Sequence, residues 1–591
     1  METSTQERRD SFSQQLIYQY TRLHSATAFR LLELLPGDNW SLPPDYEAVS
    51  YAWGNTDKKV AAICDGDRLM ISLGLQDALT QMRYSDRSRL LWVDAVCIDQ
   101  MNIEERGQQV SNMRSIYAGA QSVLVWLGTD VDGQGECAIT ALNEIAASCL
   151  CQVASKGPTE VPKLKSKDEL WDLLPEQILN NLHCDDPKTW ASMSWLFSRP
   201  WLSRLWVIQE VHSNREVQML CGSTQVSWDV VALGASYILR HSKIYLQWGF
   251  SESYYANAYY MRRRYWLERV TLASLLNWGR SFDASDPLDR VYALMGMPPF
   301  SRMQYPKAAD YSLSKVDLYT DIAAWCIRKT QNLRILYYSQ HLQDDGGFPS
   351  WVPQWDRKAR YEAIEDFLTK LRWRSTSDTK LRVEIEDSSR ILRLTGVIFD
   401  VVQSQISLGQ TTWSPCQVSG DHPVLEFWAK QQSNPTMYPT GEPSLDAFSF
   451  VLTAGLDHSL RKASDNSARF KSNFTAYLNQ LLEVSGYDSR LYGPLKDSGG
   501  VDWFNYETLV RRKCHNRSLL FTEKGYLGLG PDCQAGDLVC LIFGSEVPFI
   551  LRPANGYYQL VGDAYVHGIM EGEGMPSNGN RSAQETQFEL H

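Results

Sequence analysis

The sequence predicts an α/β domain near the N-terminus, then a helical region and a β-rich C-terminal region. The clearest observation is a strand–helix–strand pattern in residues 90–128. A second is the alternation of strand-like and helix-like segments over 31–222, which is typical of α/β domains. A third is a series of short strands, separated by Gly and Pro, that begins near residue 382.

The pattern in residues 90–128 predicts two parallel strands joined by a helix. Residues 90–96 are apolar apart from Asp94, as expected of a strand that is buried on both faces. Asn102 is a suitable N-cap for the helix that follows, and residues 123–127 form the second strand. Because such a unit is nearly always a right-handed crossover, the two strands should lie parallel in one sheet.

Five segments are expected along the chain. The polar composition near both ends favours flexible termini, and Gly and Pro mark the turns between the strands of the last large segment. The expected segments are a flexible N-terminal stretch at 1–30, the α/β domain at 31–222, a helical region at 223–343, a β-rich accessory region at 344–571 and a flexible tail at 572–591.

Charge and cysteine spacing exclude several classes of function. The formal net charge is -11, so no overall basic field attracts nucleic acid or an anionic membrane. The 12 cysteines show no C-x-x-C spacing, so we expect free thiols and no metal site. No stretch approaches the ~20 apolar residues that span a bilayer, and no signal peptide is visible. We therefore expect a cytoplasmic protein without a membrane span.

Polar and aromatic residues lie where the predicted strands end, at the sheet edge where ligands of parallel sheets bind. Ser50, Tyr51 and Trp53 are at the end of one strand, and Asp94 is at the end of another. These groups suit a polar, flat ligand. Each also has a structural alternative, because Ser50 and Tyr51 can cap the strand and Trp53 can belong to the core. For Asp94 the two roles are equally favoured, since its carboxylate can bond the backbone of the following turn.

A second candidate is Glu210, in the segment 198–211. Trp206 lies four residues earlier, so on a helix the two side chains share a face. A carboxylate beside an indole can stabilise developing positive charge while the ring stacks on a planar or cationic ligand. In the alternative interpretation Glu210 pairs on the surface with Arg204 or Arg215, and the core takes Trp201, Leu205 and Ile208. This structural role is the commoner one for a single helical glutamate.

Three segments contain dense motifs: YEAVSYAWGN at 46–55, LLWVDAVCIDQMNIEERGQQVSNMRSIYAGAQSVLVWLG at 90–128 and RPWLSRLWVIQEV at 199–211. Together they resemble the heterokaryon incompatibility (HET) domain of filamentous fungi. Similar segments continue with DPLDRVYALMGM at 286–297 and PSWVPQWD at 349–356, and with GDLVCLIFG near the C-terminus. The resemblance therefore covers nearly the whole chain.

HET domains are implicated in fungal nonself recognition and the cell death that follows, and they are regarded as distant relatives of TIR domains. The resemblance therefore implies a TIR-like parallel sheet. Several TIR domains hydrolyse NAD with a helical glutamate that has a Trp a few residues earlier, an arrangement that Trp206 and Glu210 resemble. The chain departs from TIR motifs at Leu205 and Val207, where a small residue and Cys are usual around the Trp.

The resemblance implies Glu210 as the catalytic residue and NAD as a substrate rather than a bound cofactor. Loss of nicotinamide turns a cationic ring neutral, so the main requirement is a carboxylate that stabilises the oxocarbenium-like ribose. Trp53 or Trp206 would stack on the base. The polar groups that would hold ribose or amide atoms are Ser50, Tyr51 and Asp94.

Two functions of different classes follow from the resemblance. The first is an intracellular effector of incompatibility-type cell death that acts through NAD hydrolysis. The alternative is a non-enzymatic module that binds other incompatibility proteins and forms homo-oligomers. Measuring NAD cleavage by the purified protein, both monomeric and clustered, separates these functions.

Overall fold

The computed structural model describes residues 17–25, 27–35, 45–53, 59–155, 186–240, 250, 256–258, 261, 270–340, 347–365, 373–386, 390–409, 413, 422–485, 503–576 and 584–591. The chain forms two compact units. Unit 1 comprises Met1–Val270 and Trp278–Leu313, and unit 2 comprises Thr271–Asn277 and Ser314–His591. The helical region expected at 223–343 thus contributes to both units.

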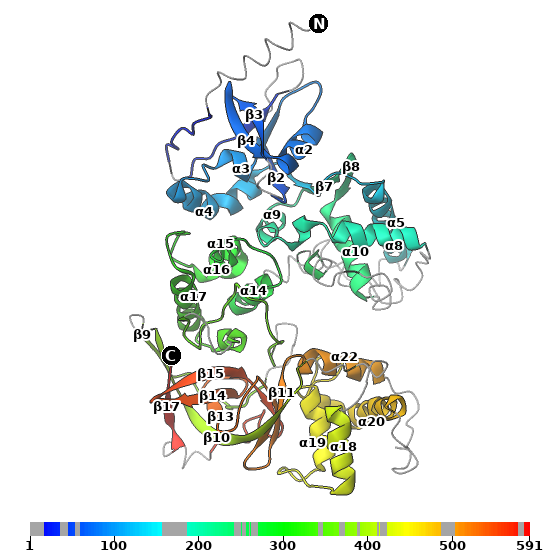
Figure 1. Ribbon diagram of the computed structural model, residues 1–591, viewed down its shortest axis with the longest axis vertical. Coiled ribbons are helices and arrows are strands. Elements are labelled where there is room, and N and C mark those ends of the chain that lie inside the picture. Colours follow the sequence, from blue (N-terminus) through cyan, green and yellow to red (C-terminus); the bar gives the residue numbers. More distant parts are fainter. Residues whose placement is uncertain are drawn as a thin grey trace. The chain divides into compact units, whose positions relative to one another are not determined.

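Unit 1 contains a six-stranded sheet with the order β1–β5–β2–β6–β7–β8. Strands β2, β7 and β8 of this sheet are labelled in Figure 1. The central strands β5, β2, β6 and β7 are parallel, whereas the edge strands β1 and β8 are antiparallel to their neighbours. The two strands predicted in 90–128 do run parallel, with β2 between them, but the sheet as a whole is mixed. The strand bounds are Leu32–Leu34 (β1), Glu47–Tyr51 (β2), Arg89–Trp92 (β5), Val123–Trp126 (β6), Val217–Cys221 (β7) and Thr224–Ser227 (β8).

Alternating side chains of β2 face opposite sides of this sheet. Val49 and Tyr51 pack with Leu75 and Met82 of α2, while Ser50 points the other way, toward α9. The expected N-cap is confirmed, since the Asn102 side chain accepts from the N–H of Glu105 in α4. The remaining elements of unit 1 are β3 (Lys59–Cys64), β4 (Asp67–Ser72), α2 (Leu73–Met82), α3 (Asp94–Cys97), α4 (Ile103–Gly119), α5 (Gln134–Ser155), α8 (Pro187–Phe197), η1 (Pro200–Ser203), α9 (Val207–Ser213), α10 (Trp228–Arg240), α15 (Asp289–Met295) and α16 (Pro298–Met303), and α14 (Leu272–Gly279) is divided between the units.

A closed β-barrel forms the larger sheet of unit 2, which confirms the expected β-rich region. The ring runs β10–β13–β14–β15–β17 and returns to β10. Its interior is filled by apolar side chains such as Val539, Leu541 and Ile550. The strand bounds are Val383–Glu386 (β9), Ile391–Ser407 (β10), Ser518–Thr522 (β11), Leu527–Gly530 (β12), Leu538–Ile542 (β13), Phe549–Ala554 (β14), Tyr557–Asp563 (β15), Tyr565–Val566 (β16) and Thr586–Leu590 (β17).

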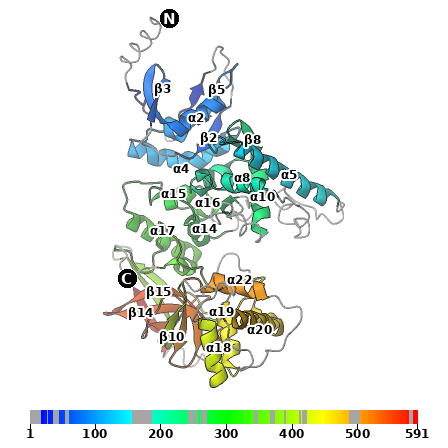
Figure 2. The same ribbon diagram turned by 45° about the vertical axis from the view of Figure 1, so that its right-hand side comes forward.

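Two expectations for the C-terminal region are corrected. The segment between β10 and β11 is helical rather than strand-rich, because its apolar residues recur at helical spacing, as in Phe470, Phe474 and Leu478 (Figure 2). Strand β17 pairs with β10, so the expected flexible tail is wrong for this stretch, because Phe588 and Leu590 are buried. The helices are α17 (Lys315–Thr330), η2 (Arg334–Tyr338), α18 (Pro423–Ser433), α19 (Ser444–Leu452), η4 (Ala463–Asn466), α20 (Ser467–Val484) and α22 (Trp503–Cys514).

At the other end of the chain, Arg30 forms an ion pair with Glu105 at 2.5 Å, so the expected flexible stretch is anchored at this residue. The other residues expected to be flexible include 1–16 and 577–583, which lie outside the described residues. Among the helices that the structure describes, none combines the length and apolar composition of a membrane span.

A fully buried ion pair joins distant parts of unit 2. Arg517 and Asp563 are both 0% exposed, and Arg517 Nη2 donates to Asp563 Oδ1 at 2.8 Å. The same nitrogen donates to the carbonyl of Glu362 at 2.8 Å, and the guanidinium lies over the ring of Tyr361 at 4.1 Å. These contacts fix the chain around 361–364 to β11 and β15.

We predict that Arg517→Met lowers the free energy of unfolding of unit 2 by about 3–5 kcal/mol, because Asp563 is left buried and unpaired. Arg382→Met is the control, since Arg382 pairs with Glu585 while 58% exposed and its loss should cost about 1 kcal/mol or less. Native-state hydrogen exchange of β11 and β15 amides measures both changes. Equal effects of the two substitutions would contradict the prediction.

Candidate functional site

Glu210 is buried in unit 1, at 1% exposure, on the short helix α9. Its Oε2 accepts a hydrogen bond from Ser50 Oγ of β2. Ser50 Oγ in turn accepts from the indole Nε1 of Trp201 at 2.6 Å. The structure therefore brings two of the predicted residues together, and the chain Trp201–Ser50–Glu210 joins η1, the central sheet and α9.

Arg204 lies in the turn between η1 and α9. This turn is held by backbone hydrogen bonds, from Leu205 N to Asp283 O at 2.9 Å and from Asp283 N to Ser203 O at 2.5 Å. The guanidinium donates from Nη1 to the carbonyl of Tyr51, and its Nη2 lies 3.9 Å from Glu210 Oε1. Sequence reasoning placed the pairing of Glu210 with Arg204 on the surface, but Glu210 is buried and the guanidinium is 18% exposed.

Asp94 and Trp53 form the more open side of this arrangement. Trp53 Nε1 donates to Asp94 Oδ2 at 3.1 Å, and Trp53 is 36% exposed. The other oxygen of Asp94 accepts from the N–H of Ala95 at 2.7 Å, at the start of α3. Asp94 thus has a structural partner, as a carboxylate after an apolar strand requires, and it also holds the exposed indole. We call Ser50, Asp94, Trp201, Arg204 and Glu210, with Trp53, the Glu210 cluster.

The charges of the two carboxylates are coupled. Burial raises the pKa of Glu210, whereas Arg204 and the hydrogen bond from Ser50 lower it, and the charge of Asp94 raises it. Burial also raises the pKa of Asp94, and Arg204 opposes this rise. One guanidinium therefore serves two carboxylates, and the charge of these three groups is negative when both carboxylates are ionised.

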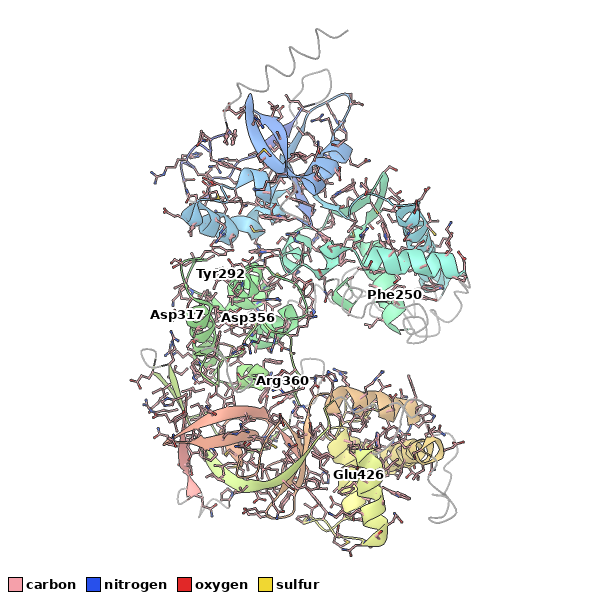
Figure 3. All side chains as sticks on the ribbon, in the orientation of Figure 1. Phe250, Tyr292, Asp317, Asp356, Arg360 and Glu426 are labelled. Carbon is pink, nitrogen blue, oxygen red and sulfur yellow. The ribbon has the colours of Figure 1, made fainter. Side chains whose placement is uncertain are left out.

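Trp206 and the ring of Tyr51 are held by other parts of unit 1. Trp206 Nε1 donates to Asp289 Oδ2 at 3.1 Å, and Asp289 also accepts from Tyr311 at 2.7 Å. Asp289 is on α15, the helix that carries Tyr292, which is labelled in Figure 3. The Tyr51 ring is buried on the α2 side, so only its backbone carbonyl contacts Arg204.

Two members of the Glu210 cluster were not predicted as site residues. The prediction that Trp201 belongs to the core is confirmed by its 0% exposure, but its indole N–H also donates to Ser50. A buried indole N–H requires a hydrogen-bond partner, and this requirement could have identified Trp201 as a member of the cluster. Arg204 was considered only as a surface partner of Glu210, because the sequence does not show that the turn after η1 folds against β2.

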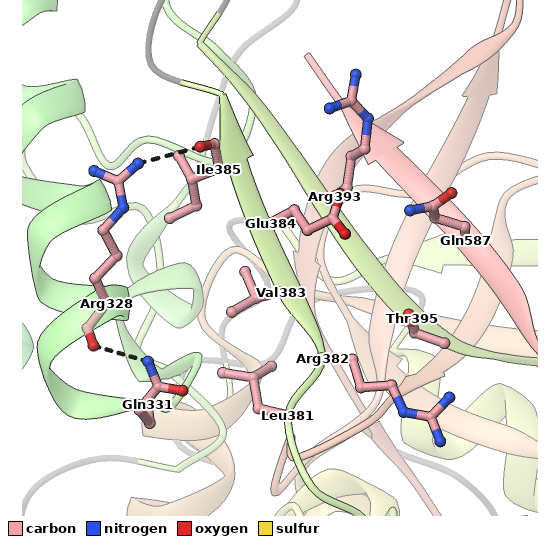
Figure 4. A pocket seen from close by; sticks show the side chains of 10 residues that line it. All are labelled: Arg328, Gln331, Leu381, Arg382, Val383, Glu384, Ile385, Arg393, Thr395 and Gln587. Atoms are coloured by element: carbon pink, nitrogen blue, oxygen red, sulfur yellow. Dashed lines mark hydrogen bonds between the residues drawn. The ribbon is translucent and has the colours of Figure 1, made fainter.

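A separate pocket of about 470 Å³ lies in unit 2, between α17 and strands β9 and β10 (Figure 4). None of the predicted site residues line it. Its arginines are engaged, since Arg382 pairs with Glu585 and Arg393 pairs with Glu386 and Glu589. In the part of the chain that the structure describes, no group of three or more His, Cys, Asp and Glu could hold a metal ion.

The Glu210 cluster has the chemistry of a cation-stabilising site. A carboxylate removed from water interacts strongly with a positive charge that develops beside it. Ser50 and Trp201 fix its position, and Asp94 adds a second negative charge near the exposed indole of Trp53. This arrangement can stabilise a cationic transition state or accept a proton, and it supplies no metal or phosphate-binding loop.

We predict that Ser50→Ala destabilises unit 1 by about 1–3 kcal/mol, because it leaves the Trp201 N–H and Glu210 without their partner. Glu210 already has a raised pKa, so it keeps a proton in the folded state over a pH range where the unfolded chain has lost it, and stability falls as pH rises there. Loss of the hydrogen bond from Ser50 should raise the pKa of Glu210 further, so this range extends to higher pH. Thermal unfolding should therefore show a larger loss at pH 8 than at pH 5.

Ser203→Ala is the control for this prediction, since Ser203 is buried in the same region and donates to the carbonyl of Pro200 at 3.0 Å. Its effect on stability should be the same at both pH values. An effect of Ser50→Ala that is equally independent of pH would contradict the coupling to Glu210.

Comparison with known proteins agrees with the resemblance noted from the motifs. Residues 46–210 match the family model of the heterokaryon incompatibility protein (HET), and residues 497–582 match that of the Het-6 β-barrel domain. Heterokaryon incompatibility protein 6, OR allele, of Neurospora crassa is 24% identical over 669 residues, which cover 93% of this chain and 94% of that protein. No solved structure matches the chain significantly. The chain therefore contains a segment of unit 1 that matches the HET domain and a segment of unit 2 that matches the Het-6 β-barrel domain.

Proposed function

We propose that this protein is a cytoplasmic effector of fungal nonself recognition and cell death, and that its HET domain hydrolyses NAD at a TIR-like site with Glu210 as the catalytic residue. The similarity to a heterokaryon incompatibility protein supports the biological role. The observation that carries the chemistry is the buried carboxylate of Glu210, oriented by Ser50 and flanked by Arg204 and Asp94.

In the proposed reaction, the bond between ribose C1′ and the nicotinamide nitrogen breaks. Its electron pair stays with the nitrogen, so the leaving nicotinamide is neutral and the ribose carries the positive charge. The oxygen of water then bonds to C1′, and one proton of that water is released. Glu210 stabilises the cationic ribose, as a carboxylate does in retaining glycosidases.

Substrate access in this proposal is from the Trp53 side. Glu210 is 1% exposed, whereas Trp53 is 36% exposed and its indole is held over Asp94 by a single hydrogen bond. A planar base that stacks on Trp53 would lie next to Asp94 and approach the carboxylate of Glu210. Ser50 and Asp94 would then hold ribose or amide groups.

We predict that Glu210→Gln abolishes NAD cleavage while preserving the fold. The amide keeps the shape and most of the packing but carries no charge, so the loss should affect turnover far more than NAD binding. A rate loss on the order of 100-fold or more is expected for removal of such a stabilising charge. The measurement is nicotinamide release by the purified full chain, together with killing on overexpression in a fungal host.

Glu105→Gln is the matched control, because Glu105 is a buried carboxylate of the same unit that is also paired with an arginine. It should retain NAD cleavage and killing. If Glu210→Gln protein still kills while cellular NAD stays unchanged, the catalytic proposal fails. The protein would then act as a non-enzymatic module that oligomerises or binds other incompatibility proteins.

A further inference from the structure

Arg204 contacts Glu210 and the end of β2, and its charge also acts on Asp94. Its Nη1 donates to the carbonyl of Tyr51 at the end of β2, which fixes the guanidinium, and its Nη2 lies 3.9 Å from Glu210 Oε1. Its charge also acts on Asp94, which is on the other side of the cluster at the start of α3. The guanidinium thus contacts Tyr51 and Glu210 directly and acts on Asp94 through its charge.

We infer that Arg204 is a positioning residue for the proposed reaction: its guanidinium, tied to the end of β2, holds the Glu210 carboxylate in place and offsets the negative charge of Glu210 and Asp94. The catalytic part of this inference rests on the proposed function. Its electrostatic part does not, because it concerns the folded protein without any ligand.

The surroundings of Glu210 support this assignment. The titratable groups that interact with Glu210 or with Arg204 are Asp94, Tyr51 and Tyr117. Burial raises the pKa of both tyrosines, so they stay neutral at physiological pH and add no negative charge to the cluster. Asp94 is a like charge that opposes ionisation of Glu210. Arg204 is therefore the cation that offsets burial at both carboxylates.

Removing this charge should leave the cluster with two buried carboxylates that repel each other. The pKa of Glu210 and of Asp94 would rise further, and the folded site would take up a proton at neutral pH. A protonated Glu210 cannot stabilise a cationic ribose. The catalytic consequence is a pH profile whose acidic limb moves to higher pH, rather than a uniform loss of activity.

The first test needs no substrate. Thermal unfolding of the full chain is compared at pH 5 and pH 8 for the wild type, Arg204→Gln, Arg204→Lys and the double variant Arg204→Gln with Glu210→Gln. We expect Arg204→Gln to lose more stability at pH 8 than at pH 5, since a folded-state pKa raised further above the unfolded value makes stability fall over a wider pH range. The double variant should recover part of the loss at pH 8, because glutamine carries no charge.

Two variants separate charge from structure. Arg204→Lys keeps the charge and should retain the pH dependence of the wild type, although a single ammonium cannot reproduce the guanidinium's contacts with both Tyr51 and Glu210. Arg199→Gln is the matched control from the same motif, since the guanidinium of Arg199 lies over the ring of Trp195 at 4.4 Å rather than beside Glu210. A pH-independent loss in Arg204→Gln, or no recovery in the double variant, would overturn the inference.

The second test measures nicotinamide release from NAD between pH 5 and pH 9. We expect the acidic limb of Arg204→Gln to lie about one pH unit or more above that of the wild type, so that its activity relative to the wild type is several-fold lower at pH 6 than at pH 8. Arg199→Gln should keep the wild-type profile. A uniform loss at all pH values would assign Arg204 a purely structural role. If even the wild type cleaves no NAD, the proposed function fails, while the unfolding measurements still decide the role of Arg204.

Discussion

The hydrogen-bonded chain from Trp201 through Ser50 to Glu210 is the constraint on which the proposed site depends. It joins strand β2 to two helical elements much later in the sequence, because Ser50 is 151 residues from Trp201 on η1 and 160 residues from Glu210 on α9. A carboxylate at 1% exposure is costly unless its oxygens are bonded and its charge is offset. Ser50 supplies the bond and Arg204 supplies the charge.

The antiparallel strands of the mixed sheet do not disturb the site, because they lie at the edges of the sheet. Ser50 lies on β2, Asp94 follows β5 and Glu210 lies on α9. Strand β2 pairs in parallel with both β5 and β6. The antiparallel strands are the outermost, β1 and β8. They extend the sheet and leave the carboxyl ends of β2 and β5 on one side, where the cluster forms. The polar groups at these strand ends could be predicted from the sequence for this reason.

The sequence was less informative where a side chain's partner is far along the chain. The strand–helix–strand pattern in 90–128 predicted two parallel strands, because strand and helix periodicities are local signals. The hydrogen-bond partner of the Trp206 indole is not a nearby residue in the sequence, since Asp289 belongs to another helix. Likewise, Arg204 could be recognised only after the turn at 204–205 was seen to pair with Asp283. In the C-terminal region, scattered Gly and Pro predicted short strands throughout. The segment between β10 and β11 nevertheless forms helices, because its apolar residues recur at helical spacing.

Closure of the β-barrel has a consequence for the synthesis of the protein. Gly396 of β10 pairs with Thr586 of β17, which is made 190 residues later. At typical translation rates of about 5–20 residues per second, this delay is roughly 10–40 s. During that interval one edge of β10 has no partner from β17, and unpaired strand edges promote aggregation. Nascent chains should therefore depend on chaperones until the last strand emerges, whereas the sheet of unit 1, whose strands end at Ser227, can assemble well before that time.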